Sequence, residues 1–97
     1  MGNLIINDNL FLRQYEVEIE DDLAIIEYAL QDRKIFLTKL IIPFSNKDEN
    51  FEEIFIREVF EIIKEKNIRV MPSAPQVRKM IKENKEFKEL LPIGVRL

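Results

Sequence analysis

Cysteine and histidine are both absent from this chain of 97 residues. Without cysteine there is no disulfide, no thiolate nucleophile and no cysteine-type zinc site. Without histidine the chain lacks the side chain most often used as a general base near neutral pH, which is also the commonest metal ligand. We therefore expect no metal site. Any chemistry must use carboxylates, lysine, tyrosine, serine, backbone groups or a cofactor.

Long hydrophobic runs are missing too, and glycine is scarce, with only two residues. No apolar run approaches the roughly 20 residues that span a bilayer, and the N-terminus lacks the pattern of a secretory signal. We therefore expect a cytoplasmic protein without a membrane partner. Hydrophobic residues still make up 46% of the chain, which is enough apolar side chain to offset chain entropy and form one core.

The formal net charge is −3, so nothing in the overall charge attracts nucleic acid, and we expect no nucleic-acid partner. The charge is uneven, however. Residues 45–68 carry seven acidic and four basic side chains, whereas residues 69–97 carry three acidic and seven basic ones. A solvated helix face is the simplest interpretation of the basic run, and contact with a phosphate or an acidic partner is the alternative. Its members recur at three- and four-residue spacing: Arg78, Lys79, Lys82, Lys85 and Lys88.

The first half of the chain has the pattern of strands. Short apolar runs and period-2 alternation predict an antiparallel meander joined by polar turns. Pro43 cannot donate a ladder hydrogen bond and should end it. The predicted strands cover residues 4–6, 15–19, 23–30 and 34–42.

In the second half the hydrophobic period changes to that of a helix. The spacing of apolar residues predicts a helix over 51–66, with Asn50 and Glu53 as a capping box and Asn67 as a left-handed residue after its end. A strand over 68–71 should pair in parallel with the end of the 34–42 strand.

A second helix follows, with Pro75 in its first turn and Ser73 and Gln76 as another capping box. Phe87 marks a short docking helix near the C-terminus. The order β-β-β-β-α-β-α predicts an α+β (α/β-like) single domain over residues 1–97.

This order, with these residues, resembles the small stand-alone members of the GNAT acetyltransferase superfamily. Four stretches carry the resemblance. The early hairpin ends in Asp21-Asp22 before Leu23-Ala24, the central strands exit through Ile42-Pro43, and the next strand ends in Met71-Pro72. The closing segment supplies Pro75, Val77, Ile81, Asn84, Glu86, Phe87 and Leu90.

The resemblance implies an acetyl-CoA site at the loop that opens the first long helix. There the family uses a glycine-rich segment, whose backbone amides hold the pyrophosphate at a helix N-terminus. In this chain every glycine of that loop is replaced, and Asp48 and Glu52 bring negative charge. Acids at this position would also stabilise the helix N-terminus through its dipole. The degenerate loop comprises Lys47, Asp48, Glu49, Asn50, Phe51 and Glu52.

The residues that would carry catalysis are depleted as well. Ala74 stands where the family usually has a cysteine, and it can neither attack nor donate a proton; Asn84 stands where the family has a histidine. Glu27 and Tyr28 remain as weak candidates for base and acid, although a lone strand glutamate more often faces solvent. We interpret Phe36, Phe51, Phe55, Phe60 and Phe87 as core side chains on buried faces.

Three functions follow from these residues. The first is a GNAT-like protein that has lost acetyl-CoA binding and catalysis, has no cofactor, and acts as a binding or interaction module for an unidentified protein or small molecule. The second is an active N-acetyltransferase that transfers acetyl from acetyl-CoA to an amine and holds the cofactor through Lys47 and the basic face of residues 78–88. The third is a structural protein that forms homo-oligomers. The loss of the glycines favours the first over the second.

Overall fold

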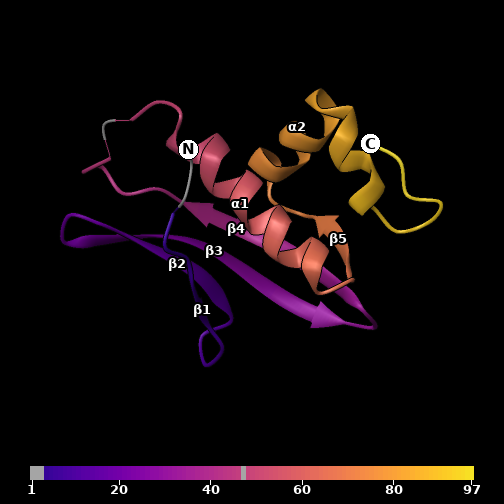
Figure 1. Cartoon of the computed structure of the whole chain (residues 1–97), viewed down its shortest axis with the longest axis horizontal. Coiled ribbons are helices and arrows are strands. Elements are labelled where there is room, and N and C mark those ends of the chain that lie inside the picture. The colour runs from indigo at the N-terminus through magenta and orange to yellow at the C-terminus, as the bar shows by residue number, and fades with distance from the viewer. Residues whose placement is uncertain (1–3, 47) are drawn as a thin grey trace.

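The computed structural model describes residues 4–46 and 48–97. It consists of a five-stranded sheet with its helices on one face (Figure 1). The elements, in chain order, are β1 (Asn7–Asn9), β2 (Gln14–Ile19), β3 (Asp22–Gln31), β4 (Lys34–Ile41), α1 (Phe51–Glu65), β5 (Arg69–Pro72), α2 (Pro75–Glu83) and the 3-10 helix η1 (Lys85–Leu90). The predicted α+β order is confirmed.

The sheet has the strand order β1-β2-β3-β4-β5, with three antiparallel pairings followed by a parallel one. The parallel pairing was predicted, but its position was wrong. Lys34 lies opposite Arg69 and Leu37 opposite Pro72, so β5 pairs with the beginning of β4 and not with its end. The 15 residues of α1 span about 22 Å, so the helix brings the chain back beside the first residues of β4 before β5 begins.

The first strand was predicted three residues too early. Residues 4–6 form no strand, and the strand is Asn7–Asn9, which was interpreted as a turn cluster. The carboxylate of Glu16 holds it in place by accepting hydrogen bonds from the side-chain amides of Asn7 at 3.2 Å, Asn9 at 2.9 Å and Gln14 at 2.7 Å. These bonds lower the pKa of Glu16. Asn7 and Asn9 therefore pair with β2 in the sheet, although asparagine is usually found in turns.

Residues with positive φ close the turns. Asp32 and Arg33 have φ values of 50° and 63°, as a two-residue turn between antiparallel strands requires. Asn67, with φ of 60°, ends α1 as predicted. Neither predicted capping box forms, because Asn50 makes no side-chain cap hydrogen bond and the N-cap residue of α2 is Ala74. Pro75 does occupy the first turn of α2.

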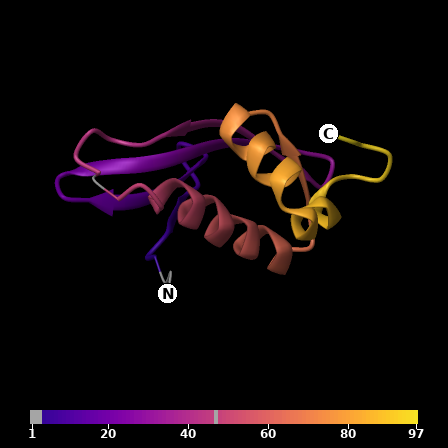
Figure 2. The same cartoon turned by 90° about the horizontal axis from the view of Figure 1, so that it is seen from above.

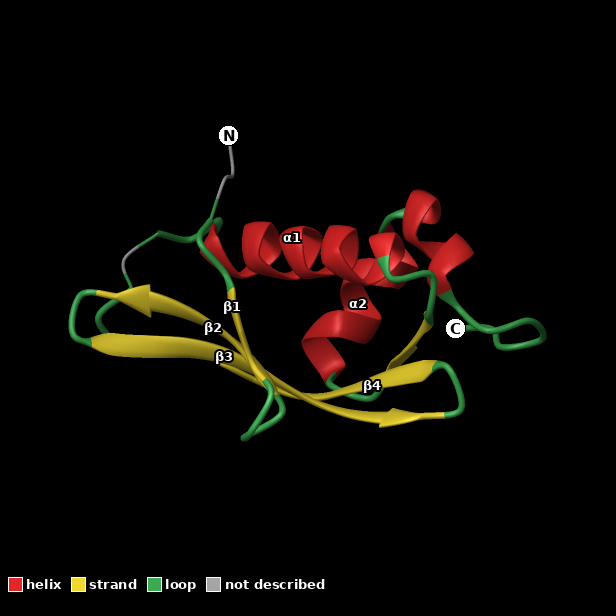
Figure 3. Ribbon diagram, turned by 60° about the horizontal axis from the view of Figure 1, so that its bottom comes forward, coloured by secondary structure: helices red, strands yellow, loops and turns green. Residues whose placement is uncertain are grey.

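The core lies between one face of the sheet and the helices (Figure 3). Seen from above, α1 runs along the sheet and α2 lies toward the C-terminal end (Figure 2). Four of the five phenylalanines predicted to be core are buried, whereas Phe36 is half-buried. It faces the other side of the sheet because Ile35 and Leu37, its neighbours on β4, both face the helices.

The buried residues include Tyr15, Ile26, Tyr28, Phe51, Phe55, Val59, Phe60, Ile63, Val77, Ile81 and Phe87. Within the described residues, no helix combines the length and the apolar character needed to cross a membrane.

Candidate functional site

The loop before α1 is the predicted phosphate site, and three of its backbone amides, those of Asp48, Asn50 and Phe51, donate hydrogen bonds within the chain. The Asp48 carboxylate accepts a hydrogen bond from the Asn50 amide at 2.9 Å, and the Asp48 carbonyl accepts one from the Phe51 amide at 3.1 Å. The Asp48 amide in turn donates to the Asn46 side chain at 3.2 Å. The Asp48 carboxylate thus occupies the Asn50 amide and the Asp48 carbonyl occupies the Phe51 amide, two donors that would otherwise be open to a bound anion. Lys47, the predicted replacement for the family's arginine, lies outside the described residues.

A groove of about 250 Å³, which we call the acidic groove, lies between the start of α1 and α2. Arg57 offsets part of its negative charge, because its guanidinium pairs with Glu53 at 3.2 Å and with Glu86 at 3.0 Å. Asp48, Glu49 and Asn50 are exposed, and Phe51 is buried beside Phe55 in the core. The lining of the groove is four carboxylates, one lysine and two apolar side chains: Glu49, Glu52, Glu53, Ile56, Lys79, Met80 and Glu83.

The pairing of strands β4 and β5 ends at Leu37 and Pro72, just before α2. The carbonyl of Leu37 accepts hydrogen bonds from the amides of Ser73 at 3.1 Å and Ala74 at 2.8 Å, and the chain then turns into α2. Ala74 is 1% exposed, so its methyl group belongs to the core. A core methyl can neither attack nor move a proton.

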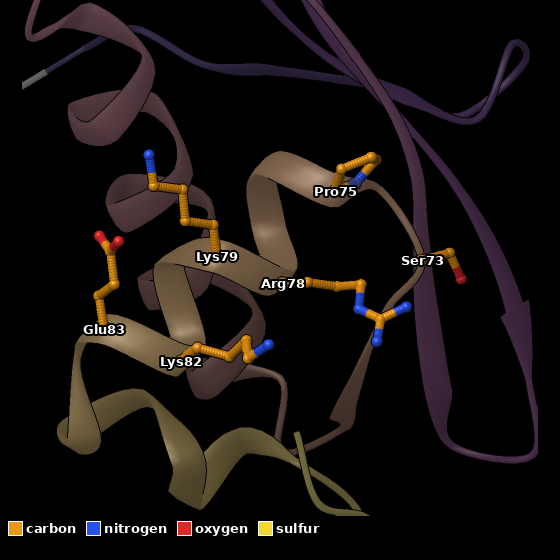
Figure 4. A pocket seen from close by; sticks show the side chains of 6 residues that line it. All are labelled: Ser73, Pro75, Arg78, Lys79, Lys82 and Glu83. Carbon is orange, nitrogen blue, oxygen red and sulfur yellow. The ribbon is translucent and has the colours of Figure 1, made fainter.

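A second hollow, of about 560 Å³, lies along α2 (Figure 4). We call it the basic hollow, because three of the six side chains that line it are cationic. Arg78 and Lys82 extend from one side of α2, while Lys79 and Glu83 extend from the other side (Figure 4). Its lining is Ser73, Pro75, Arg78, Lys79, Lys82 and Glu83.

The two candidate catalytic residues on β3 do not act together in this structure. The hydroxyl of buried Tyr28 donates to the carboxylate of Asp8 at 2.5 Å, and within the described residues no hydrogen bond joins it to Glu27. Burial, then the bond to Asp8 and the Asp8 charge, raise the pKa of Tyr28. A tyrosine with a raised pKa is a poorer acid, so this environment keeps the phenol protonated. Glu27 is half-buried and lies opposite Gln14 and Lys39 in the sheet register.

The cluster around Tyr28 could not be predicted from the sequence, because its members are far apart in the chain. Asp8 also pairs with Lys66 at 3.6 Å, which links β1, β3 and the end of α1. Tyr15 packs against Tyr28 with ring centroids 5.0 Å apart, and burial raises the pKa of Tyr15 to about 12. These side chains line a small apolar pocket of about 210 Å³. In residues 4–46 and 48–97 there is no group of three or more carboxylates suited to a metal ion.

Comparison with known proteins agrees with the fold. The profile of the GCN5-related N-acetyl-transferase family matches residues 14–90. The NMR solution structure of a GCN5-like putative N-acetyltransferase from Staphylococcus aureus superposes with a TM-score of 0.71 at 17% identity, covering 99% of this chain and 94% of the other. No curated protein matches the chain. Since the family profile spans most of the sequence, the chain belongs to the GCN5-related N-acetyltransferase (GNAT) family.

Proposed function

We propose that this protein keeps the GNAT fold but has lost acetyl-CoA binding and catalysis, and that it acts as a binding module. The observation that carries the proposal is how the loop before α1 is hydrogen-bonded and what surrounds it. Its Asn50 and Phe51 amides are occupied by Asp48, and the groove next to it is lined by four carboxylates. GNAT proteins usually place acetyl-CoA at such a loop, so the lost cradle is the feature that separates this chain from the family pattern.

The electrostatic cost of an anion in the acidic groove can be bounded. Two unit charges about 4 Å apart repel by about 1 kcal/mol in bulk water, and by about 4 kcal/mol at a partly buried surface. Glu49 and Glu52 have no ion pair within the described residues, whereas Glu53 is paired with Arg57. Among the described residues, Lys79 is the one cation that lines the groove. The repulsion from the unpaired carboxylates therefore exceeds the attraction that Lys79 supplies.

Catalysis has no residue to carry it at the position of the family's cysteine. Ala74 is buried there, and Tyr28 is held protonated by its environment. Within the described residues, no hydrogen bond joins the carboxylate of Glu27, the candidate base, to a side chain that could act as an acid. We therefore propose that the loss of chemistry accompanies the loss of the phosphate cradle.

Thermal unfolding with added ligand tests this proposal. A ligand that binds the folded chain at 100 times its Kd stabilises it by about 2.7 kcal/mol, which is a clear rise in Tm for a small domain. We expect millimolar acetyl-CoA to leave the Tm unchanged. A rise that saturates with acetyl-CoA concentration would overturn the proposal.

The second candidate function is an active N-acetyltransferase that anchors acetyl-CoA by an unusual route. The basic hollow favours it, because Arg78 and Lys82 offer cations close to the acidic groove. The discriminating measurement is release of free thiol from acetyl-CoA in the presence of a panel of amines. The active-enzyme function predicts release that depends on both protein and amine, whereas the binding-module proposal predicts none.

The third candidate is a protein that assembles with copies of itself. Leu10, Phe11 and Leu12, at the tip of the turn between β1 and β2, are 70%, 93% and 55% exposed. Three consecutive exposed apolar side chains are unusual on a monomer surface and suit contact with another chain. Sedimentation as a function of protein concentration separates this candidate from the other two, because only self-assembly predicts a mass that rises with concentration.

A further inference from the structure

We infer that the basic hollow along α2 is a binding site for the phosphate group of a small organic phosphate. This goes beyond the proposed function, because Arg78 and Lys82 line the basic hollow and not the acidic groove. Lys79 and Glu83, the one carboxylate among the described residues that line the hollow, are shared with the acidic groove and leave α2 on the other side (Figure 4). The site is therefore a different surface from the phosphate cradle that the family places before α1.

The positive charges of Arg78 and Lys82 are not balanced by ion pairs with carboxylates among the described residues. Arg78 and Lys82 are four residues apart on α2, so they lie on the same helix face one turn apart, where like charges destabilise a helix. Within the described residues the ion pairs involve only Arg57 and Lys66 as cations, so neither Arg78 nor Lys82 has a carboxylate partner. An anion held between them would relieve this repulsion and add attraction.

The side chains of Arg78, Lys82 and Ser73 supply mainly hydrogen-bond donors to the basic hollow. Arginine and lysine side chains donate and cannot accept, and the guanidinium group presents a planar fork that matches phosphate oxygens. Ser73 adds a hydroxyl, and in the described part of the chain its side chain makes no hydrogen bond. The ligand must therefore be rich in acceptors. A phosphate monoester carries close to two negative charges and three acceptor oxygens, which matches two cations and a hydroxyl better than a single carboxylate does.

The basic hollow is large enough for more than a phosphate ion. Its volume of about 560 Å³ lies within the range of small-molecule pockets and exceeds what a phosphate ion alone would fill. Pro75 gives one wall an apolar surface, so the organic part of the ligand would pack against the pyrrolidine ring while the phosphate meets Arg78 and Lys82. Free phosphate and an organic phosphate share the same anion chemistry, and the second should bind more tightly.

Two-dimensional NMR titration of the full chain tests the inference with inorganic phosphate and phenyl phosphate as separate probes. We expect saturable shifts of the backbone amides of residues 73–83 with both probes, and a several-fold lower Kd for phenyl phosphate. Shifts with inorganic phosphate only would contradict an organic ligand. A Kd for inorganic phosphate equal to or lower than the Kd for phenyl phosphate would contradict it as well. The absence of saturable shifts with either probe would overturn the site.

A matched pair of double variants separates a site from general charge attraction. Arg78→Gln with Lys82→Gln and Lys85→Gln with Lys88→Gln each remove two positive charges from exposed positions. We expect the first pair to weaken phenyl phosphate binding tenfold or more, and the second to change it less than about threefold. Equal weakening by both pairs would show that net charge alone attracts the probe. All four side chains are exposed, so we expect both double variants to fold. A Tm measurement on each variant checks this.

Failure of this inference is distinct from failure of the proposed function. If acetyl-CoA does not bind and phenyl phosphate does not bind, only the phosphate site is lost. If acetyl-CoA binds and the Arg78→Gln, Lys82→Gln variant abolishes its binding, the phosphate site stands and the active-enzyme candidate replaces the binding module. Binding of acetyl-CoA that this variant leaves intact, together with no binding of phenyl phosphate, overturns both.

Discussion

The carboxylate of Asp48 accepts a hydrogen bond from the backbone amide of Asn50, with 2.9 Å between the two atoms. The loop that opens α1 therefore contains an anion of its own, at the place where the GNAT family usually holds the pyrophosphate of acetyl-CoA. The carbonyl of Asp48 takes the Phe51 amide in the same turn. Both bonds give the helix start acceptors from the chain itself, so under the proposed function an anion at this loop would compete with Asp48 for the Asn50 amide.

Restoring the glycines should restore part of the cradle. In the triple variant Asp48→Gly, Asn50→Gly, Glu52→Gly, two carboxylates are removed and the Asn50 amide is released. Relief of repulsion is worth about 1 kcal/mol per carboxylate at a wet surface, and each recovered amide contact to an ion about 1.5–3 kcal/mol. We expect acetyl-CoA affinity, measured by calorimetry, to rise at least a hundredfold. Catalysis should not return, because Ala74 is unchanged.

The control for this variant is Glu61→Gln with Glu65→Gln, which removes two negative charges from exposed positions further along α1. It should leave acetyl-CoA affinity unchanged. A folded triple variant that binds no better than the parent would mean that the cleft itself has been rebuilt. We also expect the triple variant to lose about 1–3 kcal/mol of stability, since Asp48 no longer holds the loop and glycine is costly in a helix.

The contact between Asp8 and Tyr28 should hold the first strand onto the domain. Tyr28→Phe removes the hydroxyl and leaves a partly buried carboxylate with Lys66 as its remaining partner. Hydrogen bonds to charged groups contribute about 1.5–3 kcal/mol, so we expect a loss of that size in urea unfolding. Asp8→Asn keeps an acceptor for the hydroxyl and should cost less. A larger loss for Asp8→Asn would show that the ion pair with Lys66 dominates.

The two tyrosines predict how stability depends on alkaline pH. Both Tyr15 and Tyr28 have pKa values raised in the folded chain, Tyr15 to about 12, from an unfolded value near 10. Above pH 10 the unfolded chain releases phenolic protons that the folded chain retains, so stability is intact below pH 10 and falls as pH rises toward 12 and above. Ultraviolet absorbance should show no phenolate at pH 10.5 while the chain is folded. Half-ionisation at pH 10 in a folded chain would refute the buried cluster.

The β1–β2 tip makes a prediction about self-assembly. Phe11 is 93% exposed and lies between the exposed side chains of Leu10 and Leu12, whereas Phe44 is 102% exposed in the loop after β4, between the half-buried Pro43 and Ser45. If the tip mediates assembly, Phe11→Ser lowers the mass measured by sedimentation at high protein concentration, and Phe44→Ser does not. Equal behaviour of both variants, or a monomer at every concentration, would remove self-assembly as a function of this chain.

The sequence predicts the sheet and α1 well because their signals are local and strong. Glutamates alternate with Tyr15, Val17 and Ile19, and this pattern fixes which face of β2 is buried. Its failures have a different cause. Residues Asn7–Asn9 have the composition of a turn. They form a strand because the Glu16 carboxylate, on the neighbouring strand, accepts hydrogen bonds from the side-chain amides of Asn7 and Asn9. Local propensity contains no information about such a partner.

The candidate site likewise has a part that the sequence predicts and a part that it does not. The acids before α1 and the bases on α2 are contiguous in sequence and could be identified there. The role of Asp48 as the loop's own anion depends on backbone geometry, and the cluster of Asp8, Tyr28 and Lys66 joins residues that are 20 or more positions apart. Tertiary contacts of this kind become visible only in the folded chain.

Calorimetric titration of the unmodified protein with acetyl-CoA, at modest salt, tests the central claim most directly. The engaged amides of the loop and the carboxylates of the acidic groove predict no measurable binding, with a Kd weaker than about 1 mM. A Kd in the micromolar range would contradict the account, because it would require an anion to sit where Asp48, Glu49 and Glu52 now lie.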